Sequence, residues 1–257
     1  MNNYQKDSTL KTRISRRDFI KITLLAGFGI ISAGSFKLVS HLADADQIEV
    51  RKLKIRLPRL PAAFNGIRVA QISDIHLGGW MTIERMKKIF TGVKDQKPDL
   101  VTITGDFVQS SLWNRLPPGY VLALETELTE LSSMSPTAAV LGNHDNWADP
   151  IKITELLLRS GVRILNNDIH RIQSGSEFIY MSGINDVYAR ENDLNQVLGK
   201  LTKKTCNILL AHEPDFADVS SATGFFDLQL SGHTHGGQVN IPFFGTPVLP
   251  YLGKKYP

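Results

Sequence analysis

Five apolar segments of the chain end in short polar strings that are rich in Asp, Asn and His. The residues before each string are typical of a buried or half-buried strand. Open α/β sheets place their functional sites at the carboxyl ends of their strands. The pattern therefore predicts an α/β fold with a site at one edge. The five strings are Asp74-Ile75-His76, Gly105-Asp106, Gly142-Asn143-His144-Asp145, Ala211-His212-Glu213-Pro214 and Gly232-His233-Thr234-His235-Gly236-Gly237.

The last string is the most specific of the five. Its two histidines, His233 and His235, are separated by one residue, so on an extended chain both imidazoles leave the same face and can reach neighbouring metal ions. The flanking glycines let the chain turn sharply and approach a ligand closely. The alternative is an exposed histidine turn, and a single Asp after a strand can simply cap a helix. Five such strings in one chain favour a metal site over these structural explanations.

The segments between the strings predict alternating strands and helices. The alternation of apolar and polar residues over 48–57 is typical of a half-exposed strand, which Pro58 and Pro61 end. The strands between 162 and 182 are expected to form an antiparallel group. Further strands are predicted at 67–72, 100–104, 138–141, 162–165, 169–173, 178–182, 206–211 and 227–231, and helices at 83–95, 121–131, 151–159 and 194–201.

Charge is distributed unevenly along the 257 residues. Residues 1–45 hold seven Lys or Arg against three Asp, which accounts for the whole net charge of +4 and leaves 22 charges of each sign in the other 212 residues. Nucleic-acid-binding domains usually carry a basic face, so no stable nucleic-acid partner is expected. The hydrophobic fraction of 42% suits one globular domain with a sizeable core. The single cysteine, Cys206, excludes an intrachain disulfide and is expected to be a buried strand residue.

The basic leader resembles a twin-arginine export signal. The segment Ser15-Arg16-Arg17-Asp18-Phe19-Ile20-Lys21 differs from the usual pattern only by Ile20 in place of leucine. The apolar run that follows, 22–36, is shorter than the roughly 20 residues of a membrane-spanning helix. Residues 43–45, Ala-Asp-Ala, offer a cleavage site. We expect 1–45 to be a cleaved signal or a retained membrane anchor, and the protein to be periplasmic or on the outer face of the cytoplasmic membrane. An amphipathic or buried N-terminal helix is the alternative.

In order, spacing and composition, the five strings resemble the sequence blocks of the calcineurin-like metallophosphoesterases between residues 67 and 240. With its leader and the Gly236-Gly237-Gln238 after the last string, the sequence is similar to the bacterial exported branch, typified by small membrane-associated phosphodiesterases. The resemblance implies that residues 46–257 form a metallo-dependent phosphatase-like domain. Its expected fold is a four-layer α/β/β/α sandwich with two mixed β-sheets and a two-metal centre at one edge.

The resemblance also implies a ligand set. Asp74, His76 and His235 would hold one metal ion, Asn143, His212 and His233 the second, and Asp106 would bridge both. Carboxylate, amide and imidazole ligands without thiolates favour manganese, iron or zinc. Two such ions, roughly 3.5–4 Å apart, can bind a phosphate and activate a water. No residue is predicted to bind an organic cofactor.

Two residues of the third string are expected to act in catalysis. In the family resembled, the residue matching His144 protonates the leaving group or contacts a phosphoryl oxygen, and Asp145 would fix its ring and favour the imidazolium form. The implied enzyme is a dinuclear metal-dependent phosphoesterase that cleaves phosphodiester or phosphomonoester bonds by attack of a metal-bound hydroxide. Its expected partners are a phosphate ester, the twin-arginine export machinery and a membrane lipid.

Two other functions are compatible with the same motifs. One is a UDP-2,3-diacylglucosamine-type pyrophosphatase of lipid A synthesis, although its cytoplasmic substrate conflicts with an exported leader. The other is a non-catalytic metal-binding protein of this fold, which would usually lack some of the ligands that are complete here. The sequence assigns no role to Trp80, Trp113 or Trp147. Residues 254–257 follow soon after the last string, where further strands closing the second sheet are expected.

Overall fold

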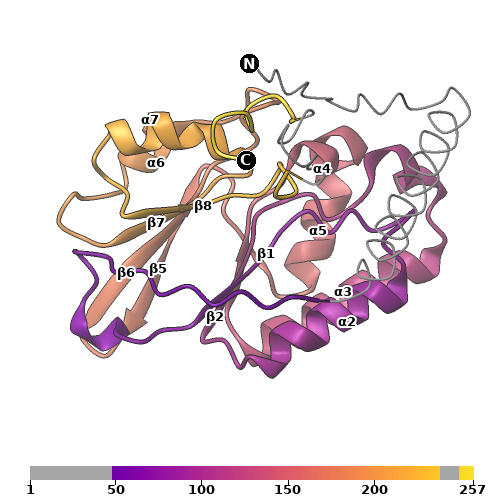
Figure 1. The fold of residues 1–257 in the computed structure, drawn as a ribbon, viewed down its shortest axis with the longest axis horizontal. Coiled ribbons are helices and arrows are strands. Elements are labelled where there is room, and N and C mark those ends of the chain that lie inside the picture. The colour runs from indigo at the N-terminus through magenta and orange to yellow at the C-terminus, as the bar shows by residue number, and fades with distance from the viewer. Residues whose placement is uncertain (1–47, 238–248) are drawn as a thin grey trace, which may run out of the picture. The chain divides into compact units, whose positions relative to one another are not determined.

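A computed structural model describes residues 48–237 and 249–257, and all its helices and strands lie within the unit 50–257 (Figure 1). The predicted leader and Gln238 lie outside the described residues. None of the described helices is long and apolar enough to cross a membrane.

The first sheet contains four parallel strands in the order β1-β2-β3-β4. Each strand is joined to the next by a crossover that contains at least one helix, as parallel pairing requires. The strands are β1 (Val69–Ile72), β2 (Leu100–Ile103), β3 (Thr137–Ala139) and β4 (Arg163–Ile164), and the crossover helices are α2 (Ile83–Asp95), α3 (Pro118–Met134), α4 (Asn143–Ala148) and α5 (Pro150–Arg159). The 3₁₀ helix η2 (Ser110–Arg115) precedes α3, and η1 (Ala62–Phe64) precedes β1.

The second sheet has the order β5-β6-β7-β8 and is mixed. Strands β5 and β6 form an antiparallel hairpin, whereas β6, β7 and β8 are parallel. The strands are β5 (Asp168–Ser174), β6 (Glu177–Gly183), β7 (Asn207–Leu210) and β8 (Leu228–Leu230). They are accompanied by α6 (Leu194–Leu198), η3 (Pro214–Phe216) and α7 (Ala217–Ala222).

The described residues form three hydrophobic cores, and successive side chains of a strand pack into different ones because they point to opposite faces of the sheet. In β7, Ile208 and Leu210 pack into a core between the two sheets, while Leu209 packs with Val197 of α6 and Phe216 of η3. The third core lies between the first sheet and the helices α2, α3 and α5, which gather on one side of it (Figure 1). The result is the predicted sandwich, in which two central sheets are each covered by helices on the outside.

Most predicted elements are present, including α2 with the bounds expected from the sequence. Cys206 is buried, although β7 begins one residue later. Among the described strands only the second sheet is mixed, because the four strands of the first sheet are all parallel. The antiparallel group is limited to β5 and β6, since β4 instead extends the parallel order of the first sheet.

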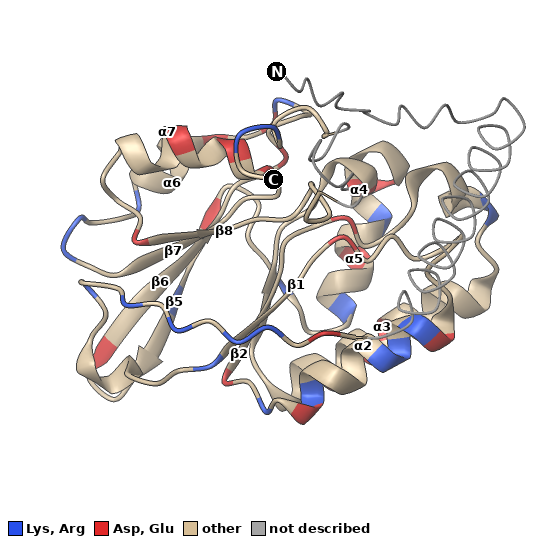
Figure 2. Ribbon diagram, in the orientation of Figure 1, with Lys and Arg blue, Asp and Glu red and all other residues tan. Residues whose placement is uncertain are grey.

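The predicted strand at 48–57 is absent. Residues 48–56 are exposed and only Leu57 reaches the core between the sheets. Alternating apolar and polar residues indicate that one face of a segment could be buried. A strand forms only if the segment also pairs with the edge of a sheet, and this segment does not. This segment instead carries a run of basic side chains that is visible in Figure 2, formed by Arg51, Lys52, Lys54 and Arg56, with Arg59 after it.

Candidate metal centre

The carboxyl ends of five strands meet at one site, so the polar strings that follow them come together. Backbone hydrogen bonds join the strings in pairs: the N–H of Asp74 donates to Gly105 O at 3.0 Å and that of His76 to Asp106 O at 2.9 Å. Across the second sheet, the N–H of Gly232 donates to His212 O at 2.9 Å. All seven predicted metal ligands lie in this region.

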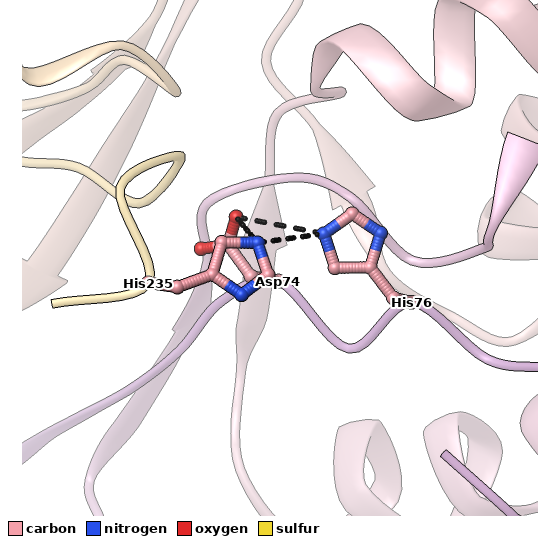
Figure 3. Close-up of side chains that lie close together, drawn as sticks. All are labelled: Asp74, His76 and His235. Atoms are coloured by element: carbon pink, nitrogen blue, oxygen red, sulfur yellow. Dashed lines mark hydrogen bonds and ion pairs between the residues drawn. The ribbon is translucent and has the colours of Figure 1, made fainter. Parts of the chain in front are cut away.

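One group of ligands consists of Asp74, His76 and His235 (Figure 3). The Nε2 atoms of the two histidines lie 3.0 Å apart, and they are 3.9 and 3.6 Å from Asp74 Oδ1. The Asp74 carboxylate also accepts the backbone N–H of His233 at 2.9 and 3.0 Å, which fixes its orientation. Two imidazole nitrogens and a carboxylate oxygen thus converge, as a cation site requires.

A second group consists of Asn143, His212 and His233. Asn143 Oδ1 lies 3.1 Å from His212 Nε2 and 2.9 Å from His233 Nδ1, and these two nitrogens are 3.2 Å apart. The other ring nitrogens face backbone carbonyls: His212 Nδ1 lies 2.6 Å from Thr104 O, and His233 Nε2 lies 2.7 Å from Tyr251 O.

These carbonyl contacts test whether the second group fits a metal ion. A carbonyl oxygen only accepts, so the nitrogen facing it carries hydrogen and the opposite nitrogen of a neutral ring presents its lone pair. The lone pairs of His212 and His233 then converge with the amide oxygen of Asn143. Three electron-pair donors this close together are stabilised by a cation, so the residues fit a divalent metal ion.

Asp106 lies between the two groups. Its Oδ2 is 3.3 Å from His76 Nε2 and 3.3 Å from His212 Nε2, and the side chain is almost fully buried. Burial raises the pKa of Asp106, but His212, through its charge and a hydrogen bond, and His76 outweigh burial and bring the pKa to about 2. Conversely, burial lowers the pKa of His212, but Asp106 dominates and raises it to about 10. The buried carboxylate therefore attracts positive charge, either as a proton or as a metal ion.

The ligands are held in an uncommon backbone conformation. Five of the seven have a positive φ, at Asp74 (54°), His76 (46°), Asp106 (58°), His233 (73°) and His235 (52°). Such values cost free energy in non-glycine residues and persist where the surrounding structure enforces them, often at functional sites. Strands β1, β2 and β8 are therefore followed by strained turns that aim these side chains into the centre.

Glycine is required where the second and third strings cross. A Cβ atom at Gly142 would collide with Asp106 Oδ1 and approach His212 Cε1 to 2.8 Å. A Cβ atom at Gly105 would lie 2.6 Å from the backbone nitrogen of Gly142 and 2.7 Å from His212 Nδ1. The two glycines thus let Asp106 and His212 approach each other across the boundary between the sheets.

His144 lies at the rim of the centre, with its ring edge-on to that of His76 at a centroid distance of 4.5 Å. Its Nδ1 lies 3.1 Å from the hydroxyl of Ser110 in η2, a residue for which the sequence offers no motif. Burial is the main influence on the ring and lowers the pKa of His144, while Asp106 opposes it. A carboxylate thus does favour the imidazolium form, as expected, but it is that of Asp106, and burial outweighs its effect on the pKa of His144.

The predicted contact between Asp145 and the His144 ring is wrong. The buried Asp145 carboxylate instead accepts backbone N–H groups from Asp106 (2.8 Å), Phe107 (2.8 Å), Val108 (3.3 Å) and Gly142 (3.0 Å). The reason is that helix α4 begins at Asn143, and consecutive residues of a helix point in different directions. Asp145 thus fixes the backbone on both sides of Asp106, not the ring of His144.

A C-terminal loop supplies the carbonyl that orients His233. Tyr251 lies in this loop, and Leu252 O accepts the N–H of Asp215 at 3.0 Å. The carboxylate of Asp215 in turn accepts three consecutive backbone N–H groups, from Lys254 (3.0 Å), Lys255 (3.0 Å) and Tyr256 (3.1 Å). Asp215 comes three residues after the predicted ligand His212. The same segment therefore carries one predicted ligand and fixes the loop whose carbonyl orients a second, His233. No sequence motif pointed to this role.

Comparison with known proteins agrees with this geometry. The family model for calcineurin-like phosphoesterase matches residues 67–237, which include all five strings. The chain belongs to the calcineurin-like phosphoesterase family. Members are metal-dependent, and the protein is a phosphoric ester hydrolase.

Three relatives illustrate the match. The metallophosphoesterase YkuE of Bacillus subtilis (strain 168) is 30% identical over 95% of this chain and 85% of its own length. Phosphodiesterase YaeI of Escherichia coli (strain K12) is 27% identical over 95% of this chain and 86% of its own. The transmembrane protein with metallophosphoesterase domain of Danio rerio is 30% identical over 91% of this chain, which spans about half (51%) of that protein.

Changing Asp215 to Ala is expected to weaken metal binding without removing a ligand. The loop 250–256 would lose three hydrogen bonds, and Tyr251 O would no longer be held against His233 Nε2. Partners of ligating histidines typically contribute about 10- to 100-fold to metal affinity, so a loss of that size is expected in competition titrations with a chelator.

The matched control is Asp218→Ala. Asp218 contacts Lys255 Nζ and the Tyr256 hydroxyl of the same loop, but it accepts none of the three backbone N–H groups. Its removal should leave metal affinity within a few-fold of the unchanged protein. Equal affinities in the Asp215 and Asp218 variants would show that the loop does not orient His233.

Proposed function

We propose that the protein hydrolyses phosphodiesters with two divalent metal ions, and phosphomonoesters less efficiently. The observation that carries this proposal is the position of Asp106, whose Oδ2 lies 3.3 Å from one histidine of each ligand group. A shared carboxylate between two groups of ligands is the arrangement of two-metal hydrolases. The name of the Escherichia coli relative, a phosphodiesterase that aligns over 95% of this chain, supports the preference for diesters.

Each side chain then has a defined task. Asp74, His76 and His235 would hold one ion, Asn143, His212 and His233 would hold the other, and Asp106 would contribute to both. Manganese, iron or zinc suits these donors, and when bound such ions neutralise phosphate charge and lower the pKa of water.

His144 is placed to handle the leaving group. Its Nδ1 is occupied by Ser110 Oγ, which leaves Nε2 to face a substrate held at the centre. A proton delivered from Nε2 to the departing alkoxide oxygen prevents charge from accumulating there. The lowered pKa of His144 makes its imidazolium a stronger acid, while it reduces the fraction of rings that are protonated at neutral pH.

The test is hydrolysis by purified protein loaded in turn with manganese, iron or zinc. An aryl phosphodiester and the monoester of the same phenol are compared at equal concentration. We expect turnover that EDTA abolishes and metal restores, with a larger kcat/KM for the diester. Failure of every metal-loaded form to cleave either ester would overturn the proposal, and a larger kcat/KM for the monoester would overturn the preference for diesters.

We also propose that residues 1–45 direct export by the twin-arginine route, so that the catalytic domain, 46–257, acts in the periplasm or on the outer face of the cytoplasmic membrane. The support is the near-complete signal around Arg16 and Arg17. Export of a folded domain suits a metalloenzyme, because its ions can be loaded before it crosses the membrane.

Changing both Arg16 and Arg17 to Lys should leave the protein in the cytoplasm, since the signal requires the arginine pair and not only its charge. Cell fractionation and immunoblotting measure the distribution. Arg13→Lys, a change of the same kind outside the motif, is the control and should not alter it. An unchanged distribution in the double variant would mean that the leader acts by another route.

A further inference from the structure

A cleft of about 540 Å³ opens beside the metal centre. Asp74, His76, His144 and His235 form the side that belongs to the centre. The remaining walls come from a turn that carries Trp80 and Met81 and from the segment of η2, which contributes Gln109, Ser111 and Leu112. A phosphate held by the metal centre therefore has one of its substituents directed along these walls.

The first wall is a closed turn. Gly78 and Met81 exchange backbone hydrogen bonds, N–H to O, at 3.0 and 3.1 Å, and the exposed Trp80 lies at the tip of this turn. The Arg85 guanidinium lies 4.4 Å from the centre of this ring and donates to Trp80 O at 2.6 Å. The Arg85 contacts thus hold the Trp80 ring in place before a ligand binds, so that binding loses little conformational entropy of this side chain.

The second wall is η2. The side chain of Leu112 lies so close to the first wall that a Cβ atom at Gly78 or Gly79 would be 3.4 Å from its Cδ1. The same 3₁₀ helix carries Ser110, the hydroxyl partner of His144. The helix η2 therefore both lines the cleft and contacts the proposed proton donor, His144 of α4, so that a leaving group in the cleft would lie near His144.

The described cleft walls offer an anionic leaving group little ionic pairing, because the Arg85 guanidinium beside the first wall is engaged with the ring and carbonyl oxygen of Trp80 and does not line the cleft. Among the described residues that line the cleft, none is Lys or Arg, and the side chains beyond the centre are apolar or neutral. A carboxylate or second phosphate placed there would lose hydration without gaining a cation. We therefore expect the cleft to bind such a group with an affinity at least several-fold lower than that for a neutral group. An uncharged ring would instead gain contact with Trp80, Met81 and Leu112.

We infer that this cleft binds the leaving alcohol of the substrate, and that this alcohol is an uncharged group with a ring or other apolar surface. The inference rests on the proposed function and adds a substrate class to it. Pyrophosphate-linked substrates, whose leaving group bears a second phosphate, are disfavoured by the same argument.

The test compares two aryl phosphodiesters whose phenols have equal pKa, one neutral and one bearing a carboxylate. The metal-loaded protein should show a kcat/KM at least about 10-fold larger for the neutral ester. Ser111→Arg places a cation on the exposed side of the cleft and should shift this ratio toward the anionic ester by about 2- to 5-fold, as expected for one solvent-exposed ion pair.

The matched control is Asn114→Arg, because Asn114 is an exposed residue of the same 3₁₀ helix that does not line the cleft. It adds the same charge and should leave the ratio unchanged. A second measurement, quenching of tryptophan fluorescence by the free phenols, should show tighter binding of the neutral phenol, and this difference should be lost in Trp80→Ala.

Three outcomes would overturn the inference. Equal kcat/KM values for the two esters would show that the cleft does not select against charge. Equal shifts in the Ser111 and Asn114 variants would assign the effect to overall charge and not to the cleft. Absence of metal-dependent hydrolysis of both esters would overturn the proposed function and the inference together, whereas the first two outcomes leave the proposed function intact.

Discussion

Replacing Asp106 by Asn is expected to remove bound metal together with all metal-dependent activity. Asp106 is the one proposed ligand that contacts both ions, and His212 and His76 hold its pKa at about 2 against the effect of burial, so it is negatively charged. The amide keeps the shape but withdraws this charge from between two cations. Elemental analysis should find less than one ion per chain, and the loss of rate should exceed the about 10²- to 10⁴-fold typical of a lost general acid.

The control for the loss of metal is the unchanged protein from which metal has been removed with a chelator. Circular dichroism should show the same fold in both, because Asn can still accept the backbone N–H of His144 that Asp106 Oδ1 accepts at 2.8 Å. Asp99→Asn, a change of the same kind at an exposed carboxylate, should retain metal and rate. If the Asp106 variant keeps a full complement of metal, the bridging assignment is wrong.

The sequence predicted that the proposed metal ligands lie close together, because each of them comes shortly after the end of a strand. Asp106, for example, comes three residues after the end of the buried strand β2, and parallel strands bring their carboxyl ends to the same edge of a sheet. The same reasoning applies to His212 and His233, which follow β7 and β8. The prediction needed only the order of strands and polar strings, and both can be read without knowing any long-range contact.

The supporting residues could not be predicted in the same way. Ser110, Asp215 and Tyr251 act through a hydroxyl, a carboxylate on backbone N–H groups and a main-chain carbonyl. None of these residues lies within a recognisable sequence pattern. Every residue has a main-chain carbonyl, so the sequence does not show which one contacts a histidine. Their partners are also distant in the chain, so only the folded structure reveals them.

The predicted contact between Asp145 and the His144 ring was wrong for a geometric reason. Its neighbour His144 suggested a local partnership, but helix α4 starts at Asn143 and turns the two side chains apart. An extended chain would not have brought them together either, since adjacent residues of a strand point to opposite faces. Proximity in sequence was thus weaker evidence than secondary structure, and the short helix was not predicted.

Changing His144 to Ala is expected to separate chemistry from metal binding. His144 is at the rim of the centre and its Nδ1 is engaged by Ser110, so its loss removes no ligand from either proposed group. Metal content should equal that of the unchanged protein. The rate on an alkyl phosphodiester should fall by about 10²- to 10⁴-fold, the usual contribution of a positioned acid.

The dependence of this loss on the leaving group decides what His144 does. A nitrophenolate departs without needing a proton, so the variant should lose much less rate on a nitrophenyl ester than on an alkyl ester. If both esters lose rate equally, His144 positions a phosphoryl oxygen and donates no proton to the leaving group. If metal content falls, His144 is a ligand, which its place in a close group with His76 and Asp106 would then explain. Measuring metal content and both rates on one preparation separates these three roles, because only a general acid combines full metal content with a loss that grows as the leaving group becomes more basic.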